Sequence, residues 1–336
     1  MTVKRKIVCI GTLVVDIFVQ GIKGSVGPDT GFQSGIEHHA GGNALNVAVG
    51  LAKLGAEKGS VICGGIAGND IFGALFESYF KKYGVAARIK KIKNRRSAKC
   101  IIIGFSKKGR AFIGDRGVNG LYSADEAIGL INSARPHIFY AGETSSLPAV
   151  DRALGKILRH SAAAGAINVV DCIITDAGYK SKISGYGRFI DVLHVNDREA
   201  GILTGKTDMR EALRVFAGHG VKLVFISSGG GPLLFSYNGA EYRMPVFPVN
   251  CADPTGAGDA FTAAVINALS RLKGTGLGEK LAIEKNLLNT ALYAQAAGAA
   301  AVTRIGCTDG VSRTAVNTFL KKHGNKLLKG VKKRRV

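Results

Sequence analysis

Segments typical of β-strands and α-helices alternate along most of the chain, and this alternation restricts the fold more than any other feature. Short apolar runs are followed by longer segments in which apolar residues recur every three or four positions. Repeated strand–helix–strand units form a mostly parallel sheet with helices on both faces. We therefore expect a doubly wound α/β fold. The predicted strands are 4–10, 59–66, 137–143, 167–173, 191–197 and 221–227, and the predicted helices are 41–55, 70–84, 124–134, 148–165, 198–205 and 256–272.

Other segments interrupt this alternation. Three short β-like runs within 88–114 follow one another without a helix between them, which is typical of a hairpin-rich insert. Together, residues near 17–40 and 88–118 predict a small β-sheet lid on the main domain. A β-ribbon is predicted at 231–246, and the last helices at 280–302 and 313–322.

The chain is strongly basic at its C-terminal end. Its formal net charge is +22, and residues 321–336 contain eight Lys and Arg residues and no acid. Dense like charge is typical of a solvated segment, so we predict a domain of residues 1–323 followed by a basic tail, 324–336. A basic surface attracts nucleic acids and phosphorylated ligands. No aromatic-rich RNA motif accompanies the tail, so specific nucleic-acid binding is not expected.

Composition excludes several other classes of protein. With 46% apolar and 21% charged residues the chain is too apolar to be disordered, and no apolar run is long enough to span a membrane. The six cysteines are scattered singly, without the C-x-x-C spacing of zinc sites. Asp16 interrupts the apolar stretch near the N-terminus, which is unlike a signal peptide. We expect a cytoplasmic enzyme with no membrane segment.

The strongest chemical signal is DPTGAGDAF at 253–261, which opens a predicted helix. Gly256 and Gly258 let a ligand approach the main chain closely, and free N–H groups at a helix N-terminus attract anions. Asp259 places a carboxylate in this anion site. An acid there is commonly only a helix cap, whereas a general base beside an oxyanion-stabilising nest also explains the glycines.

A second helix begins at GGNALN, residues 41–46. Its amides could grip ligand hydroxyl groups, although a Gly-Gly turn with an Asn cap is also common. Asp16 follows the first strand and would lie at the carboxyl edge of the sheet, where ligands bind in such folds. A lone Asp at that place is more often a turn residue.

Together these segments resemble the ribokinase-like family of carbohydrate kinases, the phosphofructokinase-B type, from about residue 6 to residue 312. The similar segments are 40–55, 65–73, 191–205, 253–261 and 299–306. The resemblance implies transfer of the γ-phosphate of ATP to a hydroxyl group of a small sugar or sugar acid. A nucleoside kinase of the same fold is the alternative. A non-catalytic nucleic-acid-binding or scaffold protein is a third interpretation, and the intact GAGD sequence weighs against it.

The resemblance also implies roles for individual residues. Asp259 matches the catalytic base. The amides of Gly256, Ala257 and Gly258 match the family's anion hole. The positions that bind the acceptor in the family are matched by Asp16, Gly42, Asn43 and Asn46.

Cofactor positions are implied in the same way. Asn196 and Glu199 match a pair that organises Mg²⁺ and phosphate through water. Asp253 and Thr255 match part of a monovalent-cation site, for K⁺, in some members. Ser227 and Gly229 lie where the nucleotide is expected, but SSGGGP at 227–232 replaces the T-L-G-x-x-G found in many members.

The segment RAFIGDRGVN at 110–119 resembles a D-R-G-A-N stretch of many sugar-kinase members. Its Arg116 favours a sugar or sugar acid, because a guanidinium suits hydroxyl or carboxylate oxygens better than the face of a base. The aromatic side chains of the predicted lid could stack on a nucleoside base, but we expect them to fill the lid core: Phe18, Phe32, Phe105 and Phe112. Members commonly dimerise through the lid, so a homodimer is expected.

Overall fold

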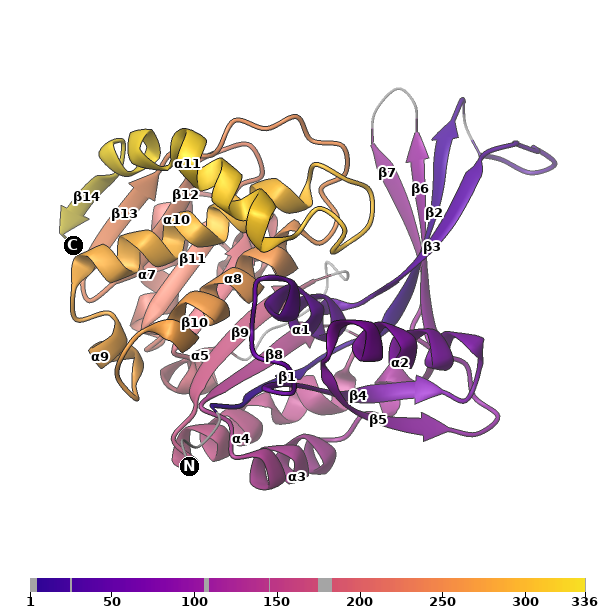
Figure 1. Ribbon diagram of the computed structural model, residues 1–336, viewed down its shortest axis with the longest axis horizontal. Helices are drawn as coiled ribbons and strands as arrows, with labels where there is room; N and C mark the ends of the chain where they lie inside the picture. Colours follow the sequence, from indigo (N-terminus) through magenta and orange to yellow (C-terminus); the bar gives the residue numbers. More distant parts are fainter. Residues whose placement is uncertain (1–4, 25, 106–108, 145, 175–182, 336) are drawn as a thin grey trace.

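The computed structural model describes residues 5–24, 26–105, 109–144, 146–174 and 183–335, and it contains two β-sheets (Figure 1). The large sheet has ten strands in the order β14-β13-β12-β11-β10-β9-β8-β1-β4-β5. These strands are β1 (Ile7–Ile10), β4 (Val61–Gly68), β5 (Ala86–Ile92), β8 (Ile138–Thr144), β9 (Ile167–Ile173), β10 (Val192–Asn196), β11 (Leu223–Ser227), β12 (Leu233–Tyr237), β13 (Ala240–Met244) and β14 (Lys332–Arg335).

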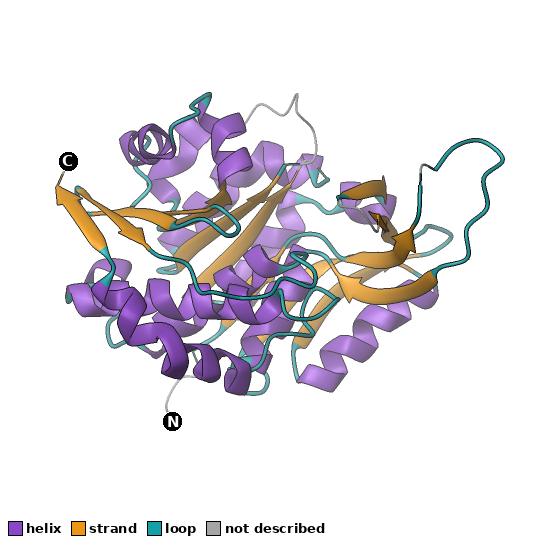
Figure 2. Ribbon diagram, turned by 90° about the horizontal axis from the view of Figure 1, so that it is seen from above, coloured by secondary structure: helices purple, strands orange, loops and turns teal. Residues whose placement is uncertain are grey.

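Helices pack on both faces of this sheet (Figure 2). One face is covered by α1 (Asn43–Lys53), α2 (Ile71–Tyr83), α8 (Ala257–Arg271), α10 (Glu284–Ala301) and α11 (Arg313–Lys329). The other is covered by α3 (Ala124–Ala134), α4 (Pro148–Ala163), α5 (Ile183–Tyr186), α6 (Asp197–Thr204) and α7 (Met209–Gly218). The short helix α9 (Leu277–Lys280) precedes α10.

Strand β1 shows how the two cores form. Its four residues are buried, with Ile7 and Cys9 in the core on the α8 side and Val8 and Ile10 in the core on the α4 side. Successive side chains of a strand point to opposite faces, so an unbroken apolar run suits a strand covered on both sides. The doubly wound fold predicted from the alternation is confirmed.

The pairing sets the polarity of the sheet. Strands β5, β4, β1, β8, β9, β10 and β11 are parallel to one another, while β12, β13 and β14 complete one edge in antiparallel pairing. The carboxyl ends of the parallel strands therefore lie at one side of the molecule, which is where ligands bind in such sheets.

The small sheet has the strand order β3-β2-β6-β7 and projects from the main body (Figure 1). Its strands are β2 (Val14–Ile22), β3 (Gly35–Gly41), β6 (Ala98–Phe105) and β7 (Arg110–Asp115). The predicted lid included residues 88–92, and this was wrong. They belong to β5, which pairs in parallel with β4 from Ile62–Ala86 to Gly68–Ile92.

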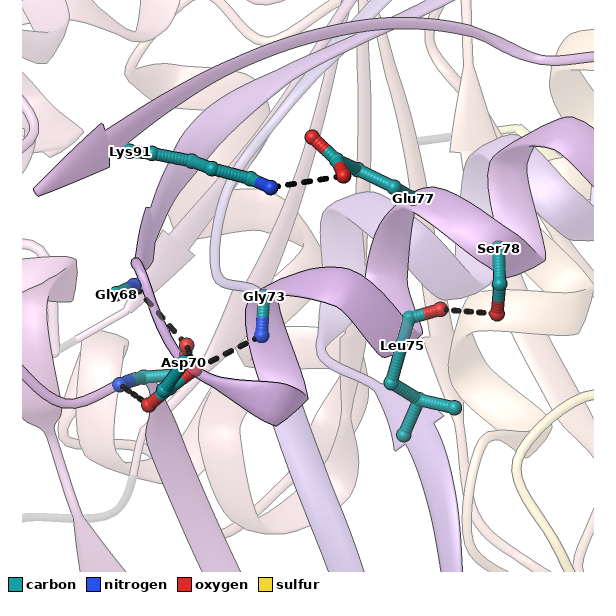
Figure 3. Close-up of polar contacts among 8 residues, drawn as sticks. Gly68, Asp70, Gly73, Leu75, Glu77, Ser78 and Lys91 are labelled. Carbon is teal, nitrogen blue, oxygen red and sulfur yellow. Dashed lines mark hydrogen bonds and ion pairs between the residues drawn. The ribbon is translucent and has the colours of Figure 1, made fainter.

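Asp70 joins the small sheet to the main body (Figure 3). It is the N-cap of α2, and its carboxylate accepts hydrogen bonds from the amide of Gly73 (2.9 Å) and from the amide (2.8 Å) and hydroxyl (2.7 Å) of Ser97. The Ser97 hydroxyl also accepts a bond from the amide of Gly68, at the end of β4. One carboxylate thus fixes the chain just before it enters β6.

The predicted basic tail, 324–336, is not a tail. Helix α11 continues to Lys329, and β14 pairs with β13 as the last strand of the large sheet. Leu327 is buried and Gly324 faces Leu292 of α10. The basic residues of β14 are exposed on an edge strand, where charged side chains oppose pairing with other molecules.

Within the part of the chain that the structure describes, no helix combines the length and apolarity that a membrane crossing requires.

Candidate active site

Asp259, the predicted base, and Asn46, a predicted acceptor-binding residue, meet at the carboxyl end of the sheet. Asp259 lies in the first turn of α8 and Asn46 in the first turn of α1, and the Asn46 Nδ2 donates to Asp259 Oδ2 at 2.7 Å. The Asn46 Oδ1 is buried and has no hydrogen-bond partner among the described residues. A ligand hydroxyl could satisfy this acceptor beside the carboxylate.

Burial controls the chemistry of Asp259. The residue is 8% exposed, and burial together with the neighbouring charge of Asp171 raises its pKa to about 8; the charges of Asp16 and Glu199 act in the same direction. A carboxylate with a raised pKa is a stronger base, and a value near the working pH suits proton transfer. Asp259 can therefore accept a proton from a bound hydroxyl group.

The turn before α8 requires glycine. Gly256 has φ +77°, and a Cβ atom there would lie 2.2 Å from the carbonyl oxygen of Cys307. The amide of Gly258 lies in the first turn of α8, where N–H groups have no acceptor within the helix. The amide of Ala257 differs from the prediction, because it already donates to the Pro254 carbonyl (3.3 Å).

The start of α1 is also built on glycine. Gly42 has φ +87°, and a Cβ atom would lie 2.4 Å from the carbonyl oxygen of Thr12. Asn43, the other asparagine predicted to bind the acceptor, has a buried Nδ2 atom without a hydrogen-bond partner among the described residues. It is fully buried, and its Oδ1 accepts hydrogen bonds from the amide (2.8 Å) and hydroxyl (3.1 Å) of Thr12. Asn43 thus positions the loop after β1.

Asp16, on β2, is buried close to the same site. Its carboxylate accepts a hydrogen bond from the thiol of Cys307 (3.1 Å), and burial raises its pKa to about 6 although this bond opposes the shift. Cys307 follows the segment 299–306, and its main chain packs closely against Gly256. One residue therefore contacts both the predicted acceptor-binding carboxylate and the anion-binding turn.

Asn196 and Glu199 form a capping box at the start of α6. Asn196 Oδ1 accepts from the amide of Glu199 (2.8 Å), and Glu199 Oε2 accepts from the amide of Asn196 (2.9 Å). Glu199 is only 8% exposed, and burial raises its pKa to about 7. The capping acid of α3, Glu126, has a more exposed side chain (26%), so Glu199 is the more buried of the two and could be neutralised by a cation bound through water.

A chain of polar side chains runs from Asp171, whose charge acts on the predicted base Asp259, to Ser227. The Thr262 hydroxyl donates to Asp171 Oδ2 (2.7 Å) and contacts His194 Nδ1 (3.0 Å), while His194 Nε2 contacts the Ser227 hydroxyl (3.1 Å). The His194 ring stacks on Phe261 at 4.4 Å. Predicted nucleotide residue Ser227 is thus linked through His194 to the carboxylate that raises the pKa of Asp259.

A cavity of about 470 Å³ adjoins the anion-binding turn. Ser227 and Gly229, predicted at the nucleotide, line one wall, and Ala257 and Gly258 line another. Most of the remaining lining is apolar: Val246, Phe247, Val249, Phe261, Ala299 and Val302. A mostly apolar cavity lined in part by the start of a helix suits a ligand with an apolar base and phosphate groups.

Arg116 is exposed at the base of the small sheet, where it precedes the 3-10 turn η1 (Gly117–Leu121). Asn119 in this turn bonds both main-chain groups of Leu13, in the loop after β1. The turn that carries Arg116 is therefore fixed against the loop that leads to Asp16.

Asp253 and Thr255 do not fit a site for a bare monovalent cation. Asp253 Oδ1 accepts hydrogen bonds from the Thr255 amide (3.0 Å) and hydroxyl (2.7 Å) and from Arg110 Nη1 (3.0 Å), and Arg110 also donates to the Thr255 hydroxyl. The cation beside these oxygens is a guanidinium group from β7.

Sequence reasoning missed four residues that the fold brings here: Asp171, His194, Arg110 and Cys307. Asp171 offered a signal, because it is a carboxylate in the otherwise apolar strand INVVDCI. Arg110 was noted only as the first residue of a lid segment. His194 and Cys307 offered no local signal, since their partners are distant in sequence.

Comparison with known proteins identifies the family. A model described as pfkB family carbohydrate kinase matches residues 4–314. The 5-dehydro-2-deoxygluconokinase of Clostridium perfringens is 26% identical over 339 residues, covering 95% of this chain and 94% of that protein. The cytidine kinase of Thermococcus kodakarensis is 37% identical over 84 residues, covering 24% of this chain and 30% of that protein.

The fold has a solved counterpart in the crystal structure of a fructokinase with bound ATP from Xylella fastidiosa. The TM-score is 0.79 at 21% sequence identity, over 96% of this chain and 100% of that one. The family match spans the two glycine-bracketed helix starts, the capping box of α6 and the small sheet. It confirms the resemblance seen in the sequence: this chain belongs to the pfkB family of carbohydrate kinases.

Proposed function

We propose that this protein transfers the γ-phosphoryl group of ATP to a hydroxyl group of a sugar or sugar acid. The observation that carries the proposal is the placement of Asp259, a buried carboxyl group with a pKa of about 8 between Asn46 and the anion-binding turn at Gly256. The cavity of about 470 Å³ that Ala257 and Gly258 help to line is proposed to hold the nucleotide.

The reaction then follows from these positions. Asp259 accepts the proton of the acceptor hydroxyl while Asn46 holds the carboxylate in place. The hydroxyl oxygen bonds to the γ-phosphorus, the bond from that phosphorus to the β,γ-bridging oxygen breaks, and ADP leaves. Amides at Gly256 and Gly258 donate to the charged oxygens of the transferred group, where such donors have their largest effect.

Glu199 and Asn196 are proposed to hold Mg²⁺ through water. Mg²⁺ commonly keeps several waters and takes few protein ligands, and when bound it neutralises charge on the transferred phosphate. Glu199 is buried with a pKa of about 7, so a nearby cation would favour its charged form.

This assignment predicts the effect of Glu199→Gln, which keeps an oxygen for the capping bond but removes the charge. The Mg²⁺ concentration for half-maximal activity should rise by about 10–100-fold, as for other groups that support a metal indirectly. Glu126→Gln is a matched control, because Glu126 forms the same capping box in α3. An unchanged Mg²⁺ titration for Glu199→Gln would refute the role.

The acceptor is tested by measuring ATP turnover with 5-dehydro-2-deoxygluconate, fructose, ribose and cytidine. We expect sugars or the sugar acid to be turned over fastest, in keeping with the full-length similarity to a 5-dehydro-2-deoxygluconokinase. If Arg116 contacts the acceptor, Arg116→Ala should raise KM for the acceptor far more than KM for ATP. Faster turnover of cytidine than of every sugar would overturn the acceptor class and leave the kinase assignment standing.

A nucleoside acceptor is the second candidate, and a specific observation favours it. The local similarity to a cytidine kinase reaches 37% over 84 residues. The lid aromatics are also not all in a core: Phe18 is buried, but Phe32 is 39% and Phe112 is 57% exposed. These exposed rings correct the expectation that lid aromatics only fill the lid core.

The predicted homodimer through the small sheet remains a proposal. Large apolar side chains are exposed on this sheet, with Ile36 on β3 67% exposed and Ile113 on β7 58% exposed. A second copy of the chain would cover them, because exposed apolar patches commonly mark interaction sites. Light scattering on the purified protein tests this directly, and a monomer at all concentrations would contradict it.

A further inference from the structure

Arg110 is the one group of the small sheet for which the structure gives direct bonds to the turn before α8. Its Nη1 lies 3.0 Å from Asp253 Oδ1 and also donates to the Thr255 hydroxyl. Arg110 is 143 residues before Asp253 and 145 residues before Thr255 in the sequence. The guanidinium lies over the ring of Phe112, 5.3 Å from its centroid, which helps to orient it.

The carboxylate of this pair is shielded from water, whereas the guanidinium is partly accessible. The Asp253 side chain is 8% exposed and that of Arg110 is 31% exposed. A buried carboxylate needs a cationic partner or a metal ion, because charge is costly to remove from water. The guanidinium supplies this charge from within the chain.

The turn that the pair stabilises also forms the proposed anion hole. Asp253 Oδ1 accepts from the Thr255 amide, one residue before Gly256, and the Asp253 amide donates to the Val302 carbonyl (3.3 Å). A positive charge at Asp253 therefore holds the segment that leads into Gly256 and Gly258. In family members with a monovalent-cation site, the resemblance gives this position to K⁺.

We propose that Arg110 takes the place of a monovalent cation in this protein, so that the small sheet itself carries the charge that orders the anion-binding turn. The inference rests on the proposed function for its kinetic consequences. Asp253 Oδ2 is buried and has no partner among the described residues, yet a bare cation there would be repelled by the adjacent guanidinium.

Two consequences follow for the protein. Catalysis needs no added K⁺, because the guanidinium of Arg110 supplies the positive charge beside Asp253. The positive charge belongs to Arg110 of β7. The small sheet must therefore lie against the turn before α8 for the anion hole to be ordered. Arg110 is thus a positioning residue that makes phosphoryl transfer depend on the placement of the small sheet over the acceptor.

The first test compares KCl, NaCl and choline chloride at equal ionic strength. Wild-type kcat/KM and Tm should be the same in the three salts. Arg110→Gln should lower kcat/KM by about 10–100-fold through loss of positioning, and KCl should then partly restore it. The Tm of Arg110→Gln should also rise in KCl relative to choline chloride, because the bare carboxylate now binds K⁺. Arg110→Lys, which keeps a charge, should retain more activity than Arg110→Gln.

Arg88→Gln is the matched control, because Arg88 is an exposed arginine on β5 that bonds only its neighbour's carbonyl group among the contacts the structure gives it. It should show neither the activity loss nor the K⁺ response. A wild-type enzyme activated by K⁺, or stabilised by K⁺ over choline, would overturn the inference, as would wild-type kcat/KM in Arg110→Gln. If no acceptor is phosphorylated, the proposed function fails, but the Tm comparison still decides whether Arg110 excludes K⁺.

Discussion

Asp259→Asn is expected to lower kcat by about 10²–10⁴-fold, the usual contribution of a positioned general base. The asparagine side chain keeps the size of the carboxyl group and can still accept a hydrogen bond from Asn46, so the local geometry should persist. Binding of ATP should be little affected, because the proposed nucleotide cavity is lined by other residues. The measurements are kcat with the preferred acceptor and the dissociation constant for ATP.

Asp125→Asn is the matched control, since Asp125 is an acid in the first turn of α3 whose side chain is 90% exposed. It removes the same charge from a helix start without touching the site and should leave kcat unchanged. Turnover near the wild-type level by a folded Asp259→Asn protein would exclude Asp259 as the base.

The raised pKa gives this substitution a second, opposite effect. An aspartate titrates near about 3.9 in an unfolded chain, whereas burial raises the pKa of Asp259 to about 8 in the fold. Ionisation therefore favours the unfolded state, and stability is lost progressively as pH rises from the first value through the second. Asp259→Asn should be as stable as wild type near pH 4 and more stable near pH 8, with the difference in Tm growing as pH rises between these values.

The same pKa predicts the pH dependence of the wild-type enzyme. A general base must be unprotonated, so kcat/KM should rise with pH and level off above about 8. An inactive variant that is more stable at alkaline pH would show that the carboxylate is kept for chemistry at the expense of the fold.

The sequence was sufficient to predict most strands of the main sheet because their signal is local. Apolar runs and helical periodicity lie within each segment, and β1 buries its whole run as that pattern requires. The error at β5 had a physical reason. Its sequence AARIKKI is basic and half exposed, which resembles a lid strand, and its partner β4 is identified only by the folded sheet.

The site was predicted in part for the same reason. Asp259, Asn46, Gly42 and Gly256 lie in short motifs whose chemistry is visible locally. The bonds that define their roles are long-range: Asn46 and Asp259 are 213 positions apart. Asn43 lies in the same motif, and in the fold its Oδ1 accepts from the Thr12 amide while its Nδ2 has no partner among the described residues. No local pattern distinguishes these two asparagines.

The prediction for the C-terminal segment was wrong because it relied on the many Lys and Arg residues and overlooked the helical spacing of the apolar residues between them. Between its lysines, α11 continues an apolar series that extends beyond the expected end at residue 322. Val316, Phe319 and Leu320 are followed by Leu327, Leu328 and Val331, all of which contact the core on the α8 side. Helical spacing of apolar residues, not the density of Lys and Arg, was the informative signal here.

Truncation after Lys322 is therefore expected to destabilise the protein strongly. It removes the buried Leu327, the partly buried Leu328 and Val331, and the strand β14 that pairs with β13. Loss of a single buried leucine side chain typically costs about 2–5 kcal/mol, and exposure of the β13 edge adds to this. The free energy of unfolding, measured by urea denaturation, should fall by at least about 3 kcal/mol.

A full-length variant with Lys332, Lys333, Arg334 and Arg335 replaced by glutamine separates packing from charge. It keeps the main-chain pairing of β14 and loses the Lys333–Glu284 ion pair (2.6 Å) and the contact of Lys333 with the Tyr242 ring, so it should lose far less stability than the truncation. Since β14 lies at the opposite end of the molecule from the small sheet (Figure 1), the folded fraction of the truncated protein should keep its kcat/KM. A truncated protein with the wild-type urea midpoint would show that α11 ends functionally at residue 322 and that the segment after it contributes nothing to the core.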